Sequence, residues 1–203
     1  MLSSAFPVRQ FIALIILTAI FVVGAKLYGQ KSPAPALTPA PTGSSQMLTR
    51  ALLATDKGPI EIELYDYEAP KTVDNFKRLV ERGYYNGLIF HRAIKDFMIQ
   101  TGDPTGTGAG GESAFGPEFG DEINGHKIEV GTVAMANRGP NTNTSQFFIV
   151  TEKAQPSLDG RYTVFGHVIS GMETVRAIAG VQTDDNDRPK QDVHVQTIKL
   201  ETK

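Results

Sequence analysis

Alternation of apolar and polar residues marks the beginning of a folded region after residue 47. Residues 60–64 read Ile-Glu-Ile-Glu-Leu, a period-two pattern typical of a half-buried strand. A second apolar segment covers residues 50–54, and Asp-Lys-Gly at 56–58 separates the two. Because Asp and Gly favour the backbone of a tight turn, this arrangement predicts a β-hairpin.

A period of three to four residues then replaces the period of two. Apolar residues recur at helical spacing in this part of the chain: Val73, Phe76, Leu79 and Val80. Pro70 before them and Gly83 after them are typical of a helix start and stop. A second, shorter helix is predicted over residues 172–178, just ahead of Gly180.

Short apolar runs make up most of the remaining chain: residues 89–93, 97–101, 132–136, 147–151, 164–169 and 195–200. Many short strands separated by turn residues, together with two helices, predict a mainly β fold, either an antiparallel barrel or a sandwich. The pattern of apolar residues does not by itself choose between these two architectures.

The front of the chain has a different character. Residues 10–25 are 16 uncharged, mostly apolar residues that follow Arg9; as a helix they would span ~24 Å, less than the ~30 Å of a bilayer core. This length and the small residues at 23–25 fit a cleaved signal peptide. The alternative is a retained membrane anchor that runs on to Tyr28, with Lys26 at the interface. Both interpretations place the rest of the chain outside the cytoplasm, anchored in the membrane or secreted or periplasmic after cleavage.

A proline-rich segment follows. Residues 29–46 contain four prolines among Ala, Thr, Ser and Gly, a composition that buries too little apolar surface to fold and favours an extended tether. The sequence therefore predicts three parts: a signal peptide or membrane anchor over 1–28, a flexible linker over 29–46, and a folded domain over 47–203.

Charge and cysteine content exclude several classes of function. Residues 1–46 hold three of the 20 basic residues and no acidic one, which leaves 17 basic and 22 acidic residues in the remainder. No run of Lys and Arg occurs there, so nucleic acid is not expected as a partner. The chain has no cysteine, so disulfides, a thiolate nucleophile and cysteine-based metal sites are excluded too.

Two segments carry the candidate chemistry. Residues 90–100 and 135–149 combine large apolar residues with a single Arg in the first and an Arg among several amides in the second, but neither has clustered acids or a Ser-His pair. These residue types suit a site that binds an extended peptide and assists a bond rotation, and they do not suit a site that breaks covalent bonds.

Five motifs in these segments and downstream occur in a familiar order: Phe-His-Arg at 90–92, Phe-Met-Ile-Gln at 97–100, Met-Ala-Asn at 135–137, Ser-Gln-Phe-Phe at 145–148, and Leu-Asp-Gly-Arg-Tyr-Thr-Val-Phe-Gly at 158–166. Over residues 48–203 the chain resembles the cyclophilin family of peptidyl-prolyl cis/trans isomerases, as a bacterial-like member with an N-terminal signal or anchor. The resemblance implies a closed eight-stranded antiparallel β-barrel capped by two α-helices, with no cofactor and no metal. It also implies that the domain binds proline-containing polypeptide segments. Together with the predicted location outside the cytoplasm, this activity predicts that the domain assists the folding of exported proteins.

The resemblance assigns the catalytic role to Arg92. Rotation of a peptide bond faces a barrier of ~18–20 kcal/mol, because the nitrogen lone pair is delocalised into the carbonyl group. In the twisted state the nitrogen regains its lone pair, which a well-placed cation stabilises. Arg suits this task because it stays charged and presents several donors in a fixed fork.

The resemblance also assigns the substrate-binding residues. The apolar cup for the proline ring comprises Phe97, Met98, Phe148 and Leu158. Gln100 would orient Arg92, whereas Gln146, Ala136 and the backbone of Asn137 would hold the peptide. Tyr162 occupies a position that is usually His in the family and would line the pocket with its ring.

Simpler interpretations exist for single residues and motifs. An isolated Phe pair is more often core, and an isolated Arg is more often part of a surface ion pair. The Gly-rich residues 106–111 match a dinucleotide-binding pattern formally, but no helix-like sequence follows them, so a loop beside the substrate groove is the better interpretation. The acidic residues 184–187 are interpreted as a solvated turn.

Three positions depart from the family pattern. Ser157 stands where many cyclophilins have a Trp that contacts the inhibitor cyclosporin, so we expect weak cyclosporin binding. Arg138 and Thr144 replace small residues beside the groove, and the added positive charge favours acidic peptides. A second hypothesis is a non-catalytic adaptor that binds proline-containing segments with the same barrel; it would not need Arg92 for turnover.

Overall fold

The computed structural model describes residues 48–202. The predicted signal or anchor (1–28) and linker (29–46) lie outside the described residues, so these assignments and the domain boundary at 47 stay predictions. Within 48–202, neither helix has the length and apolar character that crossing a membrane requires.

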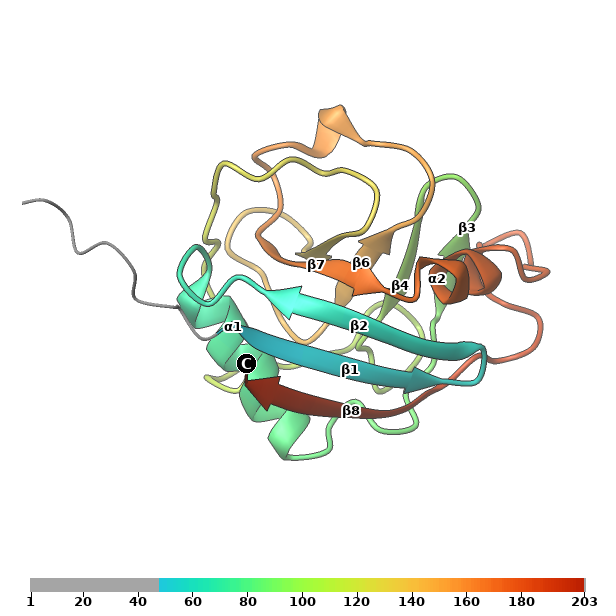
Figure 1. Cartoon of the computed structure of the whole chain (residues 1–203), viewed down its shortest axis with the longest axis horizontal. Helices are drawn as coiled ribbons and strands as arrows, with labels where there is room; N and C mark the ends of the chain where they lie inside the picture. The colour runs from blue at the N-terminus through green and yellow to red at the C-terminus, as the bar shows by residue number, and fades with distance from the viewer. Residues whose placement is uncertain (1–47, 203) are drawn as a thin grey trace, which may run out of the picture. The chain divides into compact units, whose positions relative to one another are not determined.

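Eight strands form one antiparallel sheet in the order β3-β4-β6-β5-β7-β2-β1-β8. Figure 1 shows β2, β1 and β8 side by side at one end of this order. The strands are β1 Thr49–Thr55, β2 Gly58–Leu64, β3 Arg92–Ile94, β4 Met98–Thr101, β5 Thr132–Met135, β6 Phe147–Val150, β7 Val164–Ser170 and β8 Val195–Thr202. Two α-helices, α1 Pro70–Glu81 and α2 Met172–Ala179, and the short 3₁₀ helix η1 Pro156–Leu158 complete the fold. The prediction of a mainly β, antiparallel fold with two helices is confirmed.

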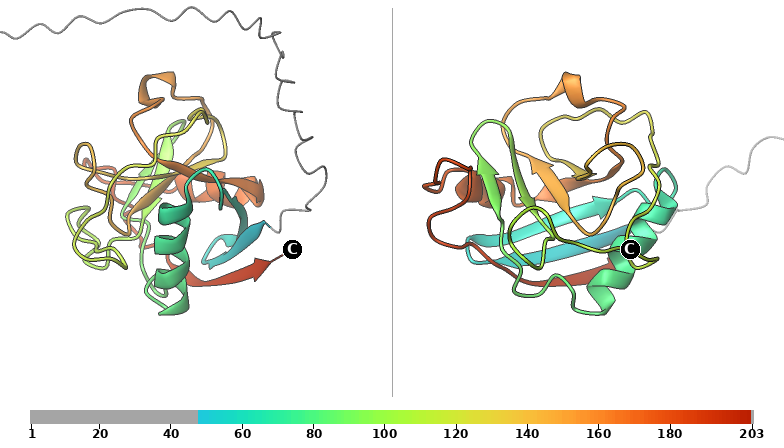
Figure 2. Two further views of the ribbon diagram at one scale, coloured as in Figure 1. Left: turned by 90° about the vertical axis from the view of Figure 1, so that its left-hand side faces the viewer. Right: turned by 180° about the vertical axis from the view of Figure 1, so that it is seen from behind.

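The sheet curls into a half-barrel that stays open, so the prediction of a closed barrel was wrong (Figure 2). The end strands β3 and β8 form no ladder with each other. Closure fails because β3 has only three residues, and the chain before it makes isolated backbone bonds instead: Gly87 N–H donates to Val195 O at 2.7 Å, and Phe90 N–H donates to Val193 O at 2.9 Å.

The main core lies inside the curl and follows the predicted periodicities. The alternate residues Ile60, Ile62 and Leu64 of β2 are fully buried, and β1 pairs with β2 in the predicted hairpin, with Thr55 opposite Gly58. All four residues that predicted the first helix are buried on α1. The phenyl ring of Phe76 on this helix packs edge-on against Phe147 of β6, with ring centroids 5.6 Å apart.

A second, smaller apolar cluster lies on the other face of the strands β4, β6 and β5. Because successive residues of a strand point to opposite faces, Phe147 joins the main core and Phe148 joins the second cluster. Ile99 and Met98 of β4 divide in the same way. These strands are therefore apolar on both faces, and the second face forms the floor of the site described next.

Candidate active site

A cavity of about 370 Å³ opens above β3, β4 and β6. Nine of the ten site residues that the resemblance implies line this cavity: Arg92, Phe97, Met98, Gln100, Ala136, Asn137, Phe148, Leu158 and Tyr162. The tenth, Gln146, lines a smaller adjoining cavity together with Gln100. Four further residues also line the main cavity. Thr107 and Gly108 belong to the Gly-rich segment that was predicted to border the groove, whereas His91 and Asn186 were not predicted to lie there.

Strand register sets the centre of this site. Arg92 of β3 lies directly opposite Gln100 of β4, which lies opposite Phe148 of β6. Directly opposite residues of an antiparallel sheet share one face. The pairing therefore aligns a cation, an amide and an aromatic ring in one row across three strands.

The floor of the cavity is apolar and rigid. Met98 and Phe148 are almost fully buried, and the ring of Phe148 meets the ring of Tyr162 edge-on, with centroids 5.5 Å apart. Leu158 enters from η1 and packs partly buried against the same cluster. A cup of this size and polarity suits a small apolar ring such as that of proline.

The amide of Gln100 forms no hydrogen bond with Arg92 in the structure. Its Nε2 donates to Gln146 Oε1 at 2.8 Å, and Gln146 Nε2 donates in turn to the carbonyl oxygens of Gly108 and Gly110 at 3.0 and 2.7 Å. The role of Gln100 in orienting Arg92 stays a prediction. Among residues 48–202, the side chain of Arg92 bonds only to Asp187, from Nε to Oδ2 at 3.3 Å.

His91 is buried beside Arg92, and within the described residues neither of its ring nitrogens has a hydrogen-bond partner. Burial disfavours the charged imidazolium and lowers the pKa of His91. The ring is therefore neutral at pH 7 and adds no second cation beside Arg92.

The Gly-rich loop over residues 103–111 is organised around the buried carboxylate of Asp103. The backbone N–H groups of Thr105, Gly108 and Gly110 donate to this carboxylate at 2.8, 2.6 and 3.1 Å. Burial opposes ionisation of Asp103, but the hydrogen bonds outweigh it and lower the pKa of this carboxyl group. Because these N–H groups point at Asp103, they are not free to bind a phosphate, which supports the interpretation as a groove loop over dinucleotide binding.

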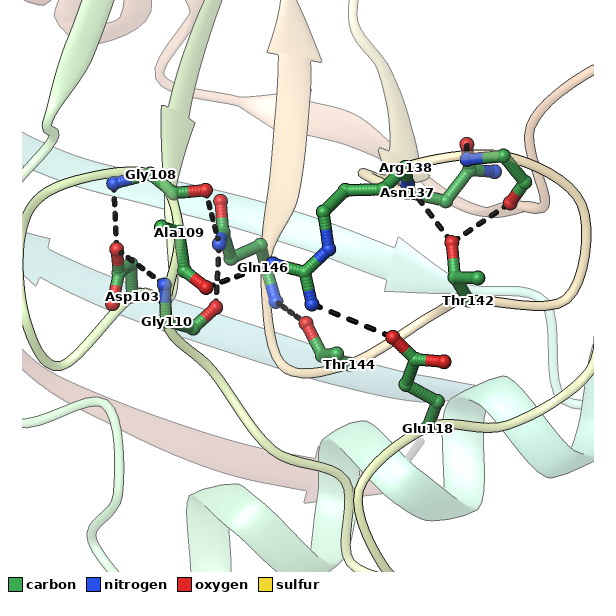
Figure 3. Close-up of polar contacts among 11 residues, drawn as sticks. Asp103, Gly108, Ala109, Gly110, Glu118, Asn137, Arg138, Thr142, Thr144 and Gln146 are labelled. Atoms are coloured by element: carbon green, nitrogen blue, oxygen red, sulfur yellow. Dashed lines mark hydrogen bonds and ion pairs between the residues drawn. The ribbon is translucent and has the colours of Figure 1, made fainter.

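Arg138 crosses from the end of β5 to the Gly-rich loop, as Figure 3 shows. Its Nη1 donates to Ala109 O at 2.7 Å, and its Nη2 lies 3.4 Å from Glu118 Oε1. Arg138, Thr144 and Gln146 are among the residues that line the adjoining cavity, which has a volume of about 50 Å³. The side chain of Arg138 therefore restricts the space beside the main cavity.

The segment at 184–187 has two residues at the site and two that do not line it. Asp184 and Asp185 are exposed, in agreement with a solvated turn, but Asn186 lines the main cavity and Asp187 contacts Arg92. No local sequence signal indicated this proximity. Within residues 48–202, no group of His, Asp and Glu side chains is arranged to hold a metal ion.

Comparisons with known proteins give matches over most of the described residues. Residues 50–200 match the family model described as cyclophilin type peptidyl-prolyl cis-trans isomerase/CLD. The peptidyl-prolyl cis-trans isomerase CYP18-2 of Arabidopsis thaliana is 49% identical over 162 residues, which cover 79% of this chain and 96% of that protein. The isomerase ppi1 of Schizosaccharomyces pombe is 53% identical over 139 residues, 68% of this chain and 89% of that protein. Both relatives are eukaryotic and give no support to the bacterial-like assignment.

Two solved structures share the fold. The cyclophilin type peptidyl-prolyl cis-trans isomerase cgd2_1660 of Cryptosporidium parvum superposes with a TM-score of 0.74 at 40% identity, covering 76% of this chain and 98% of that chain. The structure of the same protein in the presence of the dipeptide Ala-Pro gives a TM-score of 0.72, with 75% and 98% covered.

Proposed function

The chain belongs to the family of cyclophilin-type peptidyl-prolyl cis/trans isomerases, and on that premise we propose that Arg92 and the adjacent apolar cavity carry out the isomerisation. The row of Arg92, Gln100 and Phe148 across three strands is the observation that carries this assignment. It brings a permanent cation to the rim of a buried apolar cup, where an amide nitrogen next to a bound proline ring would lie.

The energetic demand on this site is moderate. An uncatalysed X–Pro bond relaxes over ~10–100 s, so a turnover of ~1–10³ s⁻¹ requires a barrier lower by about 3–7 kcal/mol. Electrostatic stabilisation and binding can supply this amount without covalent chemistry. The Nη groups of Arg92 donate to no other residue within 48–202, which leaves them available to the lone pair of the twisted nitrogen.

The apolar floor contributes by holding the proline ring while the preceding carbonyl rotates. Met98 and Phe148 exclude water beneath the ring, and the lower local dielectric strengthens the attraction between the guanidinium and the nitrogen lone pair. No proton transfer is needed, in keeping with a neutral His91.

A non-catalytic adaptor remains the competing hypothesis for the same cavity. An assay of the rate of cis/trans exchange in a short X–Pro peptide, run alongside a binding titration, separates the two. Accelerated exchange supports the proposal. Binding without acceleration would favour the adaptor.

We further propose that the domain works outside the cytoplasm and assists the folding of exported proteins. The support is the apolar segment at 10–25 followed by the proline-rich segment at 29–46. Protease treatment of cells that express the chain with a C-terminal tag, with the outer envelope opened and the cytoplasmic membrane intact, tests the location. Digestion of the tag, or its appearance in the medium, supports export, and protection of the tag until the cytoplasmic membrane is lysed would contradict it. The mass of the mature chain then distinguishes a cleaved signal peptide from a retained anchor.

Arg138 is expected to control which residues are accepted beside proline. The Arg138→Ala variant should enlarge the small cavity and raise kcat/KM for peptides with a bulky residue next to proline, by roughly tenfold. Peptides with Ala at that position should change little, because a methyl group needs no extra room. Kinetics on a matched peptide set checks this, and Glu-containing peptides test the predicted preference for acidic sequences.

Arg161→Ala is the control for charge in this experiment, because Arg161 lies near the site but does not line the small cavity. An equal gain on bulky and small peptides in Arg138→Ala, or the same gain in Arg161→Ala, would contradict a steric role for Arg138.

Weak cyclosporin binding is a further expected outcome. Ser157 lies on η1 next to Leu158 of the cavity wall, and it offers neither the aromatic surface nor the N–H donor of a Trp. These losses correspond to an affinity roughly 10–100-fold weaker than in relatives with Trp. Calorimetric titration checks this, and Ser157→Trp should tighten binding. Equal affinity in the unmodified protein would refute the expectation.

A further inference from the structure

Residues 184–188 form a turn beside the cavity that is stabilised by hydrogen bonds within the turn itself. Asp184 Oδ1 accepts hydrogen bonds from the backbone N–H groups of Asn186 and Arg188 at 2.9 and 3.0 Å. The backbone N–H of Asp184 also donates to Arg188 O at 2.8 Å. The turn therefore has a fixed shape that does not depend on a bound peptide.

Within this turn, Asp187 adopts an unusual backbone conformation. Its φ is +62°, in the left-handed region that residues other than glycine seldom occupy. Such strain persists where the surrounding structure holds it, and it concentrates at functional sites. Here it is held by the bonds of the Asp184 side chain and by the contacts that Asp187 makes with β3.

Asp187 accepts hydrogen bonds from two consecutive residues of β3. Its backbone oxygen accepts the N–H of Ala93 at 2.9 Å, and its Oδ2 accepts from Nε of Arg92 at 3.3 Å. The first contact fixes the turn against the strand, and the second fixes the carboxylate behind the guanidinium. Because the guanidinium is planar, a bond at Nε restrains the orientation of the whole group.

The turn is tied to the other side of the cavity as well. Arg188 Nη1 donates to Gly106 O of the Gly-rich loop at 2.8 Å, and Asn186 lines the cavity itself. Asp187 is thus anchored from two sides, and its carboxylate has a defined position relative to Arg92.

We propose that Asp187 is a positioning residue that orients Arg92 for catalysis, an inference that rests on the proposed role of Arg92. A carboxylate could also slow the reaction by partly neutralising the cation. The contact at Nε favours positioning, because it occupies the donor next to the side-chain stem and leaves both Nη groups free of protein partners within residues 48–202. Loss of the carboxylate should therefore lower kcat.

The test compares Asp187→Gly with Asp185→Gly in the full chain. Gly tolerates the left-handed backbone at 187, so the variant removes the carboxylate and keeps the turn. Asp185 belongs to the same turn, carries the same charge and has no bond to Arg92. We expect kcat to fall roughly tenfold in Asp187→Gly, with KM and the unfolding temperature nearly unchanged, and no comparable change in Asp185→Gly. Asp187→Asn keeps an acceptor oxygen and should recover part of the rate.

A double-mutant cycle with Arg92→Ala shows whether Asp187 acts through Arg92. The proposal requires the effect of Asp187→Gly to disappear in the Arg92→Ala background. An undiminished effect there, a kcat equal to wild type in Asp187→Gly, or an equal loss in Asp185→Gly would overturn it. A wild-type rate in the single variant Arg92→Ala would contradict the proposed function of Arg92. This result comes from the single variant alone and is therefore distinct from the outcome of the double-mutant cycle.

Discussion

Arg92→Ala is expected to lose most of the catalytic acceleration, about 10²–10³-fold in kcat/KM, the usual cost of removing one group that stabilises transition-state charge. The loss should appear mainly in kcat, because the lone pair that Arg92 stabilises exists only in the twisted state. Exchange rates of an X–Pro peptide at several enzyme concentrations measure this effect, with wild type and variant prepared in parallel.

The fold of the Arg92→Ala variant should be intact. The side chain of Arg92 is 42% exposed and its ion pair with Asp187 is on the surface, where such pairs contribute about 0–1 kcal/mol. The unfolding midpoint is therefore the first control. Arg92→Lys, which keeps the charge but loses the planar fork, should retain an intermediate rate. A folded Arg92→Ala variant with the wild-type rate would remove Arg92 from the mechanism.

Gly102→Ala is expected to produce the largest loss of stability among simple substitutions near the site. Gly102 has φ +92°, and a Cβ there would overlap the backbone oxygen of Ser145 and lie 2.9 Å from the Cα of Gln146. The strained backbone and the overlap each cost about 1–3 kcal/mol. Their sum corresponds to a fall in unfolding temperature of roughly 10 °C for a domain of this size, which thermal unfolding measures.

Gly160→Ala provides the matched control for Gly102→Ala. Gly160 has φ +69°, but no atom lies within 4 Å of the position that its Cβ would take. This variant therefore isolates the cost of the left-handed backbone, about 1–2 kcal/mol. Equal losses in the two variants would mean that the close approach of Gly102 to Ser145 and Gln146 has no energetic effect.

Much of the fold was predictable because local patterns report directly on burial. The alternation at 60–64 and the helical spacing from Val73 to Val80 both reappear as buried faces. The pair Phe147 and Phe148 shows the limit of such patterns. A period of two requires the two rings to point in opposite directions, but it does not say which one faces the core; only the matched motif predicted that Phe148 lines the cavity.

Contacts between distant segments could not be predicted from local patterns. Asp187 lies 95 positions after Arg92, and its surroundings in the sequence resemble any solvated acidic turn. The open barrel was missed because the closed barrel was implied by the family resemblance, and the apolar pattern did not test it. The apolar run at 89–93 predicted a strand, but Phe90 bonds to Val193 outside any ladder and β3 begins only at Arg92. How far a strand extends depends on the partner it meets.

The open half-barrel has two sheet edges, and an unprotected edge can recruit a strand from another molecule and start aggregation. The turn at 184–188 protects the edge at β3, because the N–H of Ala93 is already bonded to Asp187 O. On β8 the exposed charges of Lys199 and Glu201 oppose docking of a second chain. The turn that contacts Arg92 therefore also occupies a backbone donor of this edge, so a substitution made in the turn to alter its contact with Arg92 also alters the protection of the edge.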